Sequence, residues 1–316
     1  MKNIVFFNYA HKGDVFLSRA FVSEIMETLK NFDINFSNAH YWEEYLLRDL
    51  DCKFVKLVEV PDVHLKKKKE CDENFVKGDT VYINTWIGRY FKQSKPFYGE
   101  CNLRSIYSLM YAEIYNFLSE VFSVDFQLKD IIQYFPTIDY SVFNIASVDE
   151  FLKNNKGKKV LLCNGPALSG QCEYNGDLTS TIEKLLGKYT DTIFITTHKT
   201  NLPSDRLFYT GDITQSDLSL YGEGQVSTQI QDINEISYLS RYCDLIIGRS
   251  SGPFTFTNVY ENMIDENKKF LCFGERETDC APYQLDISCQ YVYEKFDTLE
   301  SLEETIFELI ENETEN

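Results

Sequence analysis

Residues 243–257 read CDLIIGRSSGPFTFT and combine a strand signal with a loop and a helix start. The apolar run at 244–247 is typical of a buried strand in a parallel sheet. Two glycines and two serines interrupt the run at 248–252. Pro253 suits the first position of a helix, because its missing N–H would be unpaired there. The stretch therefore predicts a strand, a tight polar loop and a helix N-terminus.

A loop of this kind is a candidate anion site. Its backbone N–H groups and the positive end of the helix dipole favour phosphate or carboxylate. Ser250 and Ser251 add hydroxyl donors, and Gly252 allows the backbone to approach a ligand closely. Arg249 adds a charged partner for a phosphate. A capped helix start with a surface arginine is the alternative interpretation.

Strands and helices alternate on both sides of this stretch. In the first half we expect strands at 3–8, 34–36, 54–58 and 80–84, and helices at 15–32, 40–50 and about 103–122. In the second half we expect strands at 160–163, 192–196, 207–209, 244–247, 269–273 and 290–293, and helices at 179–186, 232–242 and 297–310. The alternation predicts α/β domains with parallel sheets, in which ligands bind beyond the carboxyl ends of the strands.

The length of 316 residues is enough for two such domains. We place one at residues 1–150 and the other at 151–316, with a connection around 135–159. The last helix carries an apolar face and could pack back on the N-terminal domain.

Composition limits the possible partners. A formal net charge of −18 argues against nucleic-acid binding, which needs a basic surface. The nine cysteines form no C-x-x-C pair and no zinc-binding pattern, which favours reduced thiols. Neither a secretion signal nor a membrane-spanning run of about 18 apolar residues is visible. We therefore expect a cytoplasmic protein whose membrane contact is at most peripheral.

Asp14, in the tripeptide Lys12-Gly13-Asp14, directly follows the first strand and is the first candidate for catalysis. A carboxylate in that loop could accept a proton from a substrate hydroxyl as a general base. Asp is also a preferred N-cap residue, so a role limited to capping the helix is the alternative. His11 is a competing base.

Four further residues are candidates for binding. Glu235, on the helix before 243–257, could hydrogen-bond a ribose, or it could be a solvated helix charge. Asn164 and Gly165 follow the first strand of the second half, and His198 follows the next; each could contact a phosphate or a sugar, or be an exposed loop residue. No nucleotide-binding or zinc motif is present, and no D-x-D pair is placed to hold a metal–nucleotide complex, which favours chemistry without a metal ion.

Two segments together resemble the heptosyltransferase-like glycosyltransferases (family 9 type), which have the GT-B fold. They are NIVFFNYAHKGDVFLSRAFVSEI at 3–25 and EISYLSRYCDLIIGRSSGPFTFT at 235–257. The resemblance implies two Rossmann-like domains with parallel sheets facing a cleft, the first on the acceptor side and the second binding the nucleotide sugar. It implies an inverting, metal-independent transfer of a sugar from a nucleotide diphosphate sugar to a glycan or glycolipid acceptor, with no cofactor.

The resemblance also assigns roles to residues. Asp14, preceded by Gly13, falls on the catalytic base, Glu235 near the contact to the donor ribose, and Ser251 and Gly252 on the turn that holds the diphosphate. The chain has Ser250 where the family usually has Asp and Thr255 where it usually has His, so the donor sugar need not be heptose.

Two other functions stay open at this point. One is a GT-B nucleotide-sugar epimerase or hydrolase, and the other is a protein that binds a nucleotide or glycan without turnover. The middle region contains aromatic side chains that could stack on sugar rings or belong to the core, namely Trp86, Tyr90, Tyr98 and Tyr107.

Overall fold

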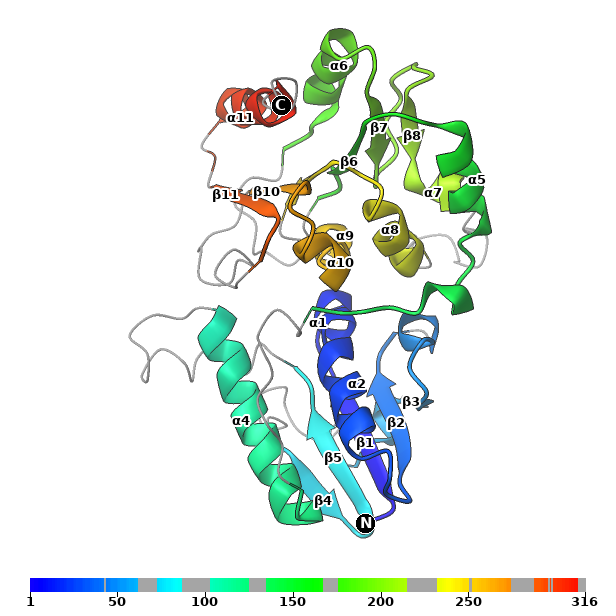
Figure 1. Cartoon of the computed structure of the whole chain (residues 1–316), viewed down its shortest axis with the longest axis vertical. Helices are drawn as coiled ribbons and strands as arrows, with labels where there is room; N and C mark the ends of the chain where they lie inside the picture. The colour runs from blue at the N-terminus through cyan, green and yellow to red at the C-terminus, as the bar shows by residue number, and fades with distance from the viewer. Residues whose placement is uncertain are drawn as a thin grey trace. The chain divides into compact units, whose positions relative to one another are not determined.

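The computed structural model of the chain is shown in Figure 1. It describes residues 1–42, 44–61, 73–86, 103–124, 135–166, 176–214, 232–249, 252–273, 287–294, 296 and 298–311. The described residues form two compact units, one ending at Ile138 and the other beginning at Asp139 and including the C-terminal helix.

Unit 1 is built on a five-stranded sheet of order β3-β2-β1-β5-β4. Its strands are β1 (Asn3–Asn8), β2 (Asn35–His40), β3 (Lys53–Lys56), β4 (Phe75–Lys77) and β5 (Thr80–Asn84). All pairs are parallel except β4 with β5, which are antiparallel. Its helices are α1 (Lys12–Leu17), α2 (Arg19–Thr28) and α4 (Leu103–Phe122), with single 3-10 turns η1 (Glu44–Leu47) and η2 (Leu57–Glu59).

Both faces of β1 are covered, which explains its nearly continuous apolar sequence. Phe7 and Tyr9 belong to a buried cluster with Ala39, Leu57 and Val60. In Figure 1, α1 and α2 cross the sheet in front of β1. α2 buries Phe21, Val22 and Ile25. β1 is therefore the central strand on which the rest of unit 1 is assembled.

Two expectations for unit 1 are corrected. The helix predicted at 15–32 starts earlier and is divided at Ser18, whose hydroxyl donates to the carbonyl of Val15 at 2.7 Å. The helix predicted at 40–50 is wrong: β2 continues to His40, pairing with β1 in register Asn8–His40, and only the 3-10 turn η1 follows. Pairing with a central strand outweighs the local helical pattern.

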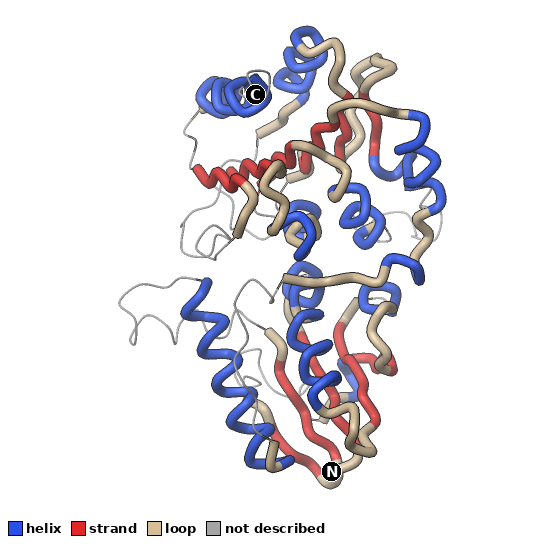
Figure 2. The backbone as a smooth tube through the Cα atoms, in the orientation of Figure 1, coloured by secondary structure: helices blue, strands red, loops and turns tan. Residues whose placement is uncertain are grey.

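Unit 2 is built on a six-stranded, fully parallel sheet of order β11-β10-β9-β6-β7-β8 (Figure 2). Its strands are β6 (Lys159–Cys163), β7 (Ile193–Thr196), β8 (Leu207–Tyr209), β9 (Leu245–Arg249), β10 (Lys269–Phe273) and β11 (Gln290–Glu294). Its helices are α5 (Ala146–Asn154), α6 (Thr179–Lys188), α7 (Thr210–Thr214), α8 (Ile233–Ser240), α9 (Gly252–Thr255), α10 (Tyr260–Met263) and α11 (Leu299–Glu311), with the 3-10 turn η5 (Tyr140–Val142).

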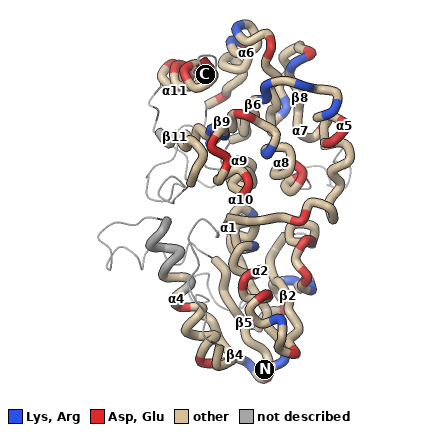
Figure 3. Tube along the Cα trace, in the orientation of Figure 1, with Lys and Arg blue, Asp and Glu red and all other residues tan. Residues whose placement is uncertain are grey.

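The last helix, α11, packs in the core of unit 2. Its residues Leu302, Ile306, Leu309 and Ile310 join the buried cluster of β6, β9 and β10. Glu303 is buried beside them and accepts hydrogen bonds from Thr181 Oγ1 at 2.9 Å and Lys184 Nζ at 2.6 Å. The apolar face of α11 is thus occupied within unit 2. Figure 3 shows further acidic residues along α11.

The predicted architecture of two α/β domains with parallel sheets is confirmed. Among the described helices, none has both the length and the apolar character to cross a membrane. Of the predicted site residues, Asn164 and His198 follow the ends of β6 and β7, and Arg249 ends β9.

Candidate functional site

The same turn follows three neighbouring strands of unit 1. In each case the last strand residue accepts a hydrogen bond from the backbone N–H two residues later. Asn8 Oδ1 binds the N–H of Ala10 at 3.0 Å, His40 Nδ1 that of Trp42 at 3.1 Å, and Asn84 Oδ1 that of Trp86 at 2.9 Å. All three accepting side chains are buried. Because β2 and β5 flank β1, the three turns lie in a row at the carboxyl end of the sheet.

Side chains join these turns to one another. The indole Nε1 of Trp42 donates to the carbonyl of Ala10 at 3.2 Å, which ties the β2 turn to the β1 turn. On the other side, Asn8 Nδ2 donates to Thr85 Oγ1 at 3.3 Å, and the Thr85 N–H donates to the carbonyl of Phe7 at 2.9 Å. The row of turns is therefore a connected platform.

Asp14 follows the middle turn of this platform in the chain, as the third residue of α1. The N-cap of α1 is His11, and Asp14 accepts a backbone hydrogen bond from His11 from the third helical position. Burial raises the pKa of Asp14, and the charge and backbone of His11 and a hydrogen bond from the Trp86 side chain partly oppose this. The result is a carboxylate that is a stronger base than an exposed Asp and is held by its neighbours.

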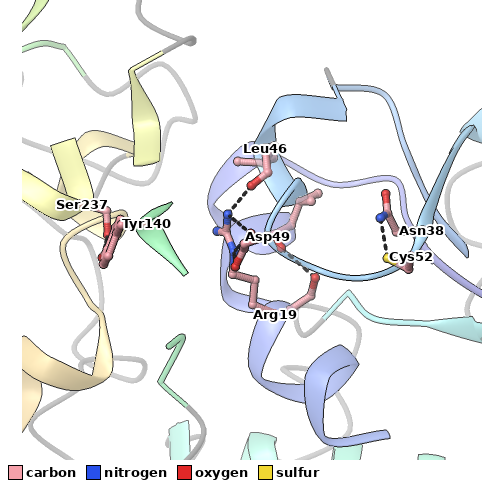
Figure 4. A network of polar contacts seen from close by, with 9 residues as sticks. Arg19, Asn38, Leu46, Asp49, Cys52, Tyr140 and Ser237 are labelled. Carbon is pink, nitrogen blue, oxygen red and sulfur yellow. Dashed lines mark hydrogen bonds and ion pairs between the residues drawn. The ribbon is translucent and has the colours of Figure 1, made fainter. Parts of the chain in front are cut away.

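The segment after Trp42 is anchored to α2 by a buried ion pair. The Nε of Arg19 donates to Asp49 Oδ1 and Oδ2 at 3.1 and 3.2 Å, and its Nη2 donates to the carbonyl of Leu46 (Figure 4). Both side chains of the pair are almost fully buried. This contact fixes η1, and with it the chain that leaves the Trp42 turn.

In unit 2 the predicted residues also gather at strand ends. Asn164, after β6, and His198, after β7, exchange two hydrogen bonds: Asn164 Nδ2 donates to the His198 carbonyl at 3.0 Å, and Asn164 Oδ1 accepts from the His198 N–H at 2.8 Å. The Asn164 carboxamide thus joins two loops, and the exposed His198 is held at their edge.

Arg249, at the end of β9, directs its guanidinium to backbone carbonyls of unit 2. Its side chain is fully buried. Nη1 donates to the carbonyls of Asn164 and Gly165 at 3.0 and 3.1 Å, and Nη2 donates to that of Gly176. The guanidinium therefore supports the loop after β6 from within the protein.

The glycines of 243–257 differ in their surroundings. A Cβ at Gly248 would lie 2.6 Å from the Cβ of Cys163 and 2.8 Å from a ring carbon of Phe254, so this glycine is required for packing between β6 and α9. A Cβ at Gly252 would meet nothing closer than 3.5 Å. Of the predicted donor-site residues, Ser250 and Ser251 lie outside the described residues.

Two carboxylates lie near the start of α8. Glu235 is 2% exposed, so it is not a solvated helix charge. Asp232 is the N-cap of α8, and burial raises its pKa to about 7 against hydrogen bonds from Thr210 and Thr214. Asp232 was not predicted from the sequence, because an Asp immediately before a helix is a signal for a cap and not for a shifted pKa.

His40 and Trp42 were also missed, since both lay in or beside a wrongly predicted helix. Trp86 was considered and is at the platform, while Tyr90, Tyr98 and the side chain of Tyr107 lie outside the described part of the chain. Within the described residues, no three His, Cys, Asp or Glu side chains gather as a metal site.

No family model matches the sequence, and no curated protein matches it. Three solved structures are similar over nearly the full chain. E. coli heptosyltransferase WaaC with ADP-2-deoxy-2-fluoro heptose has a TM-score of 0.48 at 8% identity, covering 99% of this chain and 100% of the other. E. coli ADP-heptose LPS heptosyltransferase II has a TM-score of 0.44 at 10% identity, covering 99% of this chain and 100% of the other. A family 9 glycosyltransferase from Veillonella parvula has a TM-score of 0.42 at 10% identity, covering 96% of this chain and 89% of the other. Identities and TM-scores this low describe a distant likeness.

Proposed function

We propose that the protein is an inverting glycosyltransferase that moves a sugar from a nucleotide diphosphate sugar to a glycan or glycolipid acceptor, without a metal ion. The observation that carries this proposal is the environment of Asp14. A carboxylate at the end of the central strand, with its pKa raised by burial and its neighbours fixed by the platform, is suited to take a proton from an alcohol.

The reaction runs as a single displacement. The Asp14 carboxylate accepts the proton of the acceptor hydroxyl, and the acceptor oxygen forms a bond to the anomeric carbon. The bond between that carbon and the diphosphate oxygen breaks, and the nucleoside diphosphate leaves with the electron pair. Attack from the face opposite the leaving group inverts the anomeric configuration, and one base is sufficient for this chemistry.

Unit 2 supplies the donor side of the proposal. The loops after β6, β7 and β9 hold Asn164, Gly165, His198 and Gly252 at strand ends, where α/β sheets bind ligands. Glu235 is the proposed ribose contact, and Ser250 and Ser251 stay the proposed hydroxyl donors to the diphosphate. Arg249 acts as a positioning residue, because its contacts support the loop after β6 from inside.

The test is release of nucleotide from a panel of UDP-, GDP-, ADP- and dTDP-linked sugars, with and without added glycans. We expect release that depends on one donor and increases with a suitable glycan, and a fall of at least about 100-fold in Asp14→Asn. Asp33→Asn, which changes an exposed carboxylate of the same unit, is the matched control and should retain activity.

The other functions correspond to distinct outcomes. Release that is independent of any glycan would indicate an epimerase or hydrolase. Thermal stabilisation by a nucleoside diphosphate, with no release and no effect of Asp14→Asn, would sink the transferase proposal in favour of a binding protein.

A further inference from the structure

The two tryptophans of the chain occupy equivalent places on the platform. Trp42 and Trp86 each lie two residues beyond the end of a strand, on β2 and β5 respectively, the two neighbours of β1. Asp14 follows β1 between them. The backbone N–H of each tryptophan is fixed by the preceding strand residue, so both indoles are attached to rigid elements.

Each indole is also oriented through its N–H. That of Trp42 donates to the carbonyl of Ala10, and that of Trp86 hydrogen-bonds Asp14. The polar edges of both indoles are therefore directed at the segment that carries the proposed base. An indole N–H is a donor only, so these bonds define which way the rings lie.

Both indoles remain partly exposed in spite of these contacts. Lys12 Nζ lies 4.3 Å from the centroid of the Trp42 ring, and the Tyr9 ring packs at 5.1 Å and 57° against Trp86. A core role alone does not explain the placement, because a core tryptophan has no need of solvent access at the carboxyl end of a sheet. Partly exposed aromatic rings beside a few fixed polar groups are typical of a site for a small ligand.

A pyranose ring matches this arrangement chemically. Its C–H groups form apolar faces that can lie against an indole, while its hydroxyls point outward from the ring edge toward hydrogen-bonding groups. A flat nucleobase would use the faces but has no hydroxyl to offer a general base.

We propose that Trp42 and Trp86 form the acceptor subsite of the enzyme and hold a pyranose ring so that one of its hydroxyls lies at Asp14. This inference rests on the proposed function for the identity of its ligand as an acceptor. The two indoles act as specificity residues that favour ring sugars over open-chain alcohols, and Lys12 lies at the same edge.

Because the chain has only these two tryptophans, its indole fluorescence reports on this subsite alone. Trp42→Phe leaves Trp86 as the single reporter, and Trp86→Phe leaves Trp42. The probes are methyl β-D-glucopyranoside, methyl β-D-galactopyranoside and N-acetylglucosamine. D-glucitol, which carries hydroxyls without a ring, is the control, and no donor is added.

We expect at least one ring sugar to give a saturable change of emission in both single-tryptophan proteins, and glucitol to give none. Replacing either tryptophan by Ala should weaken that binding about threefold to tenfold. Phe32→Ala, which removes an exposed aromatic ring elsewhere in unit 1, should leave it unchanged. Circular dichroism of each variant establishes that it is folded.

Three results would overturn the subsite: no response to any sugar, a response from only one of the two indoles, or a response to UDP and ADP in place of the sugars. Failure of the transferase proposal is distinguishable from these. Sugar binding reported by both indoles, with no transfer from any nucleotide sugar, would contradict the transferase and leave a glycan-binding platform.

Discussion

The imidazole of His40 accepts a hydrogen bond at Nδ1 from the backbone N–H of Trp42, at 3.1 Å. This contact fixes a neutral ring with its proton on Nε2, because an accepting nitrogen carries no hydrogen. Burial lowers the pKa of His40 to about 4, and the nearby Arg19 contributes in the same direction. The position of Trp42 therefore depends on His40 remaining neutral.

Acid should loosen this turn. The unfolded chain protonates His40 at its ordinary pKa of about 6.5, whereas the folded chain does so only near pH 4, so stability is lost as pH falls between these values. His40→Asn places at β2 the residue type that makes the same turn after β1 and β5. We expect this substitution to remove up to about 3 kcal/mol of the pH-dependent change in the free energy of unfolding. Urea unfolding at pH 4.5 and 7.5 measures it; equal pH dependence in both proteins would contradict the assignment.

Asp232 should make the stability of the protein depend on pH in the opposite sense. Its folded-state pKa of about 7 lies above the ordinary value of 3.8, so the folded protein keeps a proton that the unfolded chain releases. This stabilisation is present at low pH and is lost as pH rises through about 7. Asp232→Asn mimics the protonated form and should be more stable than the wild type at pH 8, by roughly 1–3 kcal/mol. The same urea series tests this, and a less stable Asp232→Asn at pH 8 would show that the charged form is favoured.

The sequence was most informative where local pattern and sheet position agree. The strand at 269–273 and the long helix from residue 103 to 122 were predicted with the bounds that the structure has, because their apolar patterns are not overridden by neighbours. The strand predicted at 34–36 was too short and His40 was misassigned as the start of a helix, since only pairing with β1 extends the strand to His40. The short antiparallel β4 was missed for the same reason.

For the candidate site, the sequence predicted where the strands end, but it did not predict which way the side chains point. Asp14 could be selected because it follows an apolar strand directly. Arg249 was selected in the same way, yet its guanidinium turns inward to carbonyls that come from residues 164–176, a contact no local pattern encodes. The platform could not be predicted, because it depends on β2 and β5 being neighbours of β1.

Gly248 and Gly252 should respond differently to the same substitution. Gly248→Ala places a methyl group against Cys163 and Phe254, and we expect a loss of about 1–3 kcal/mol of stability from overpacking. Gly252→Ala meets only ordinary contacts and should change stability by about 0.5 kcal/mol or less. Thermal or urea unfolding compares the two. A destabilised Gly252→Ala with a tolerated Gly248→Ala would show that the packing of α9 on β9 is different from the one described.

Variants of Arg249 distinguish a residue that supports the loop after β6 from one that contacts a phosphate directly. Arg249→Met removes the donors to three carbonyls that are buried or half-buried and should cost about 2–4 kcal/mol of stability without any ligand present. Arg249→Lys keeps the charge but has no planar fork to reach carbonyls on two sides, so it should also be destabilised, by a smaller amount. Lys153→Met, on the last turn of α5, removes an exposed charge from the same unit and is the control. If both Arg249 variants unfold like the wild type and differ only in affinity for UDP or ADP, then the guanidinium contacts the nucleotide directly and does not support the loop.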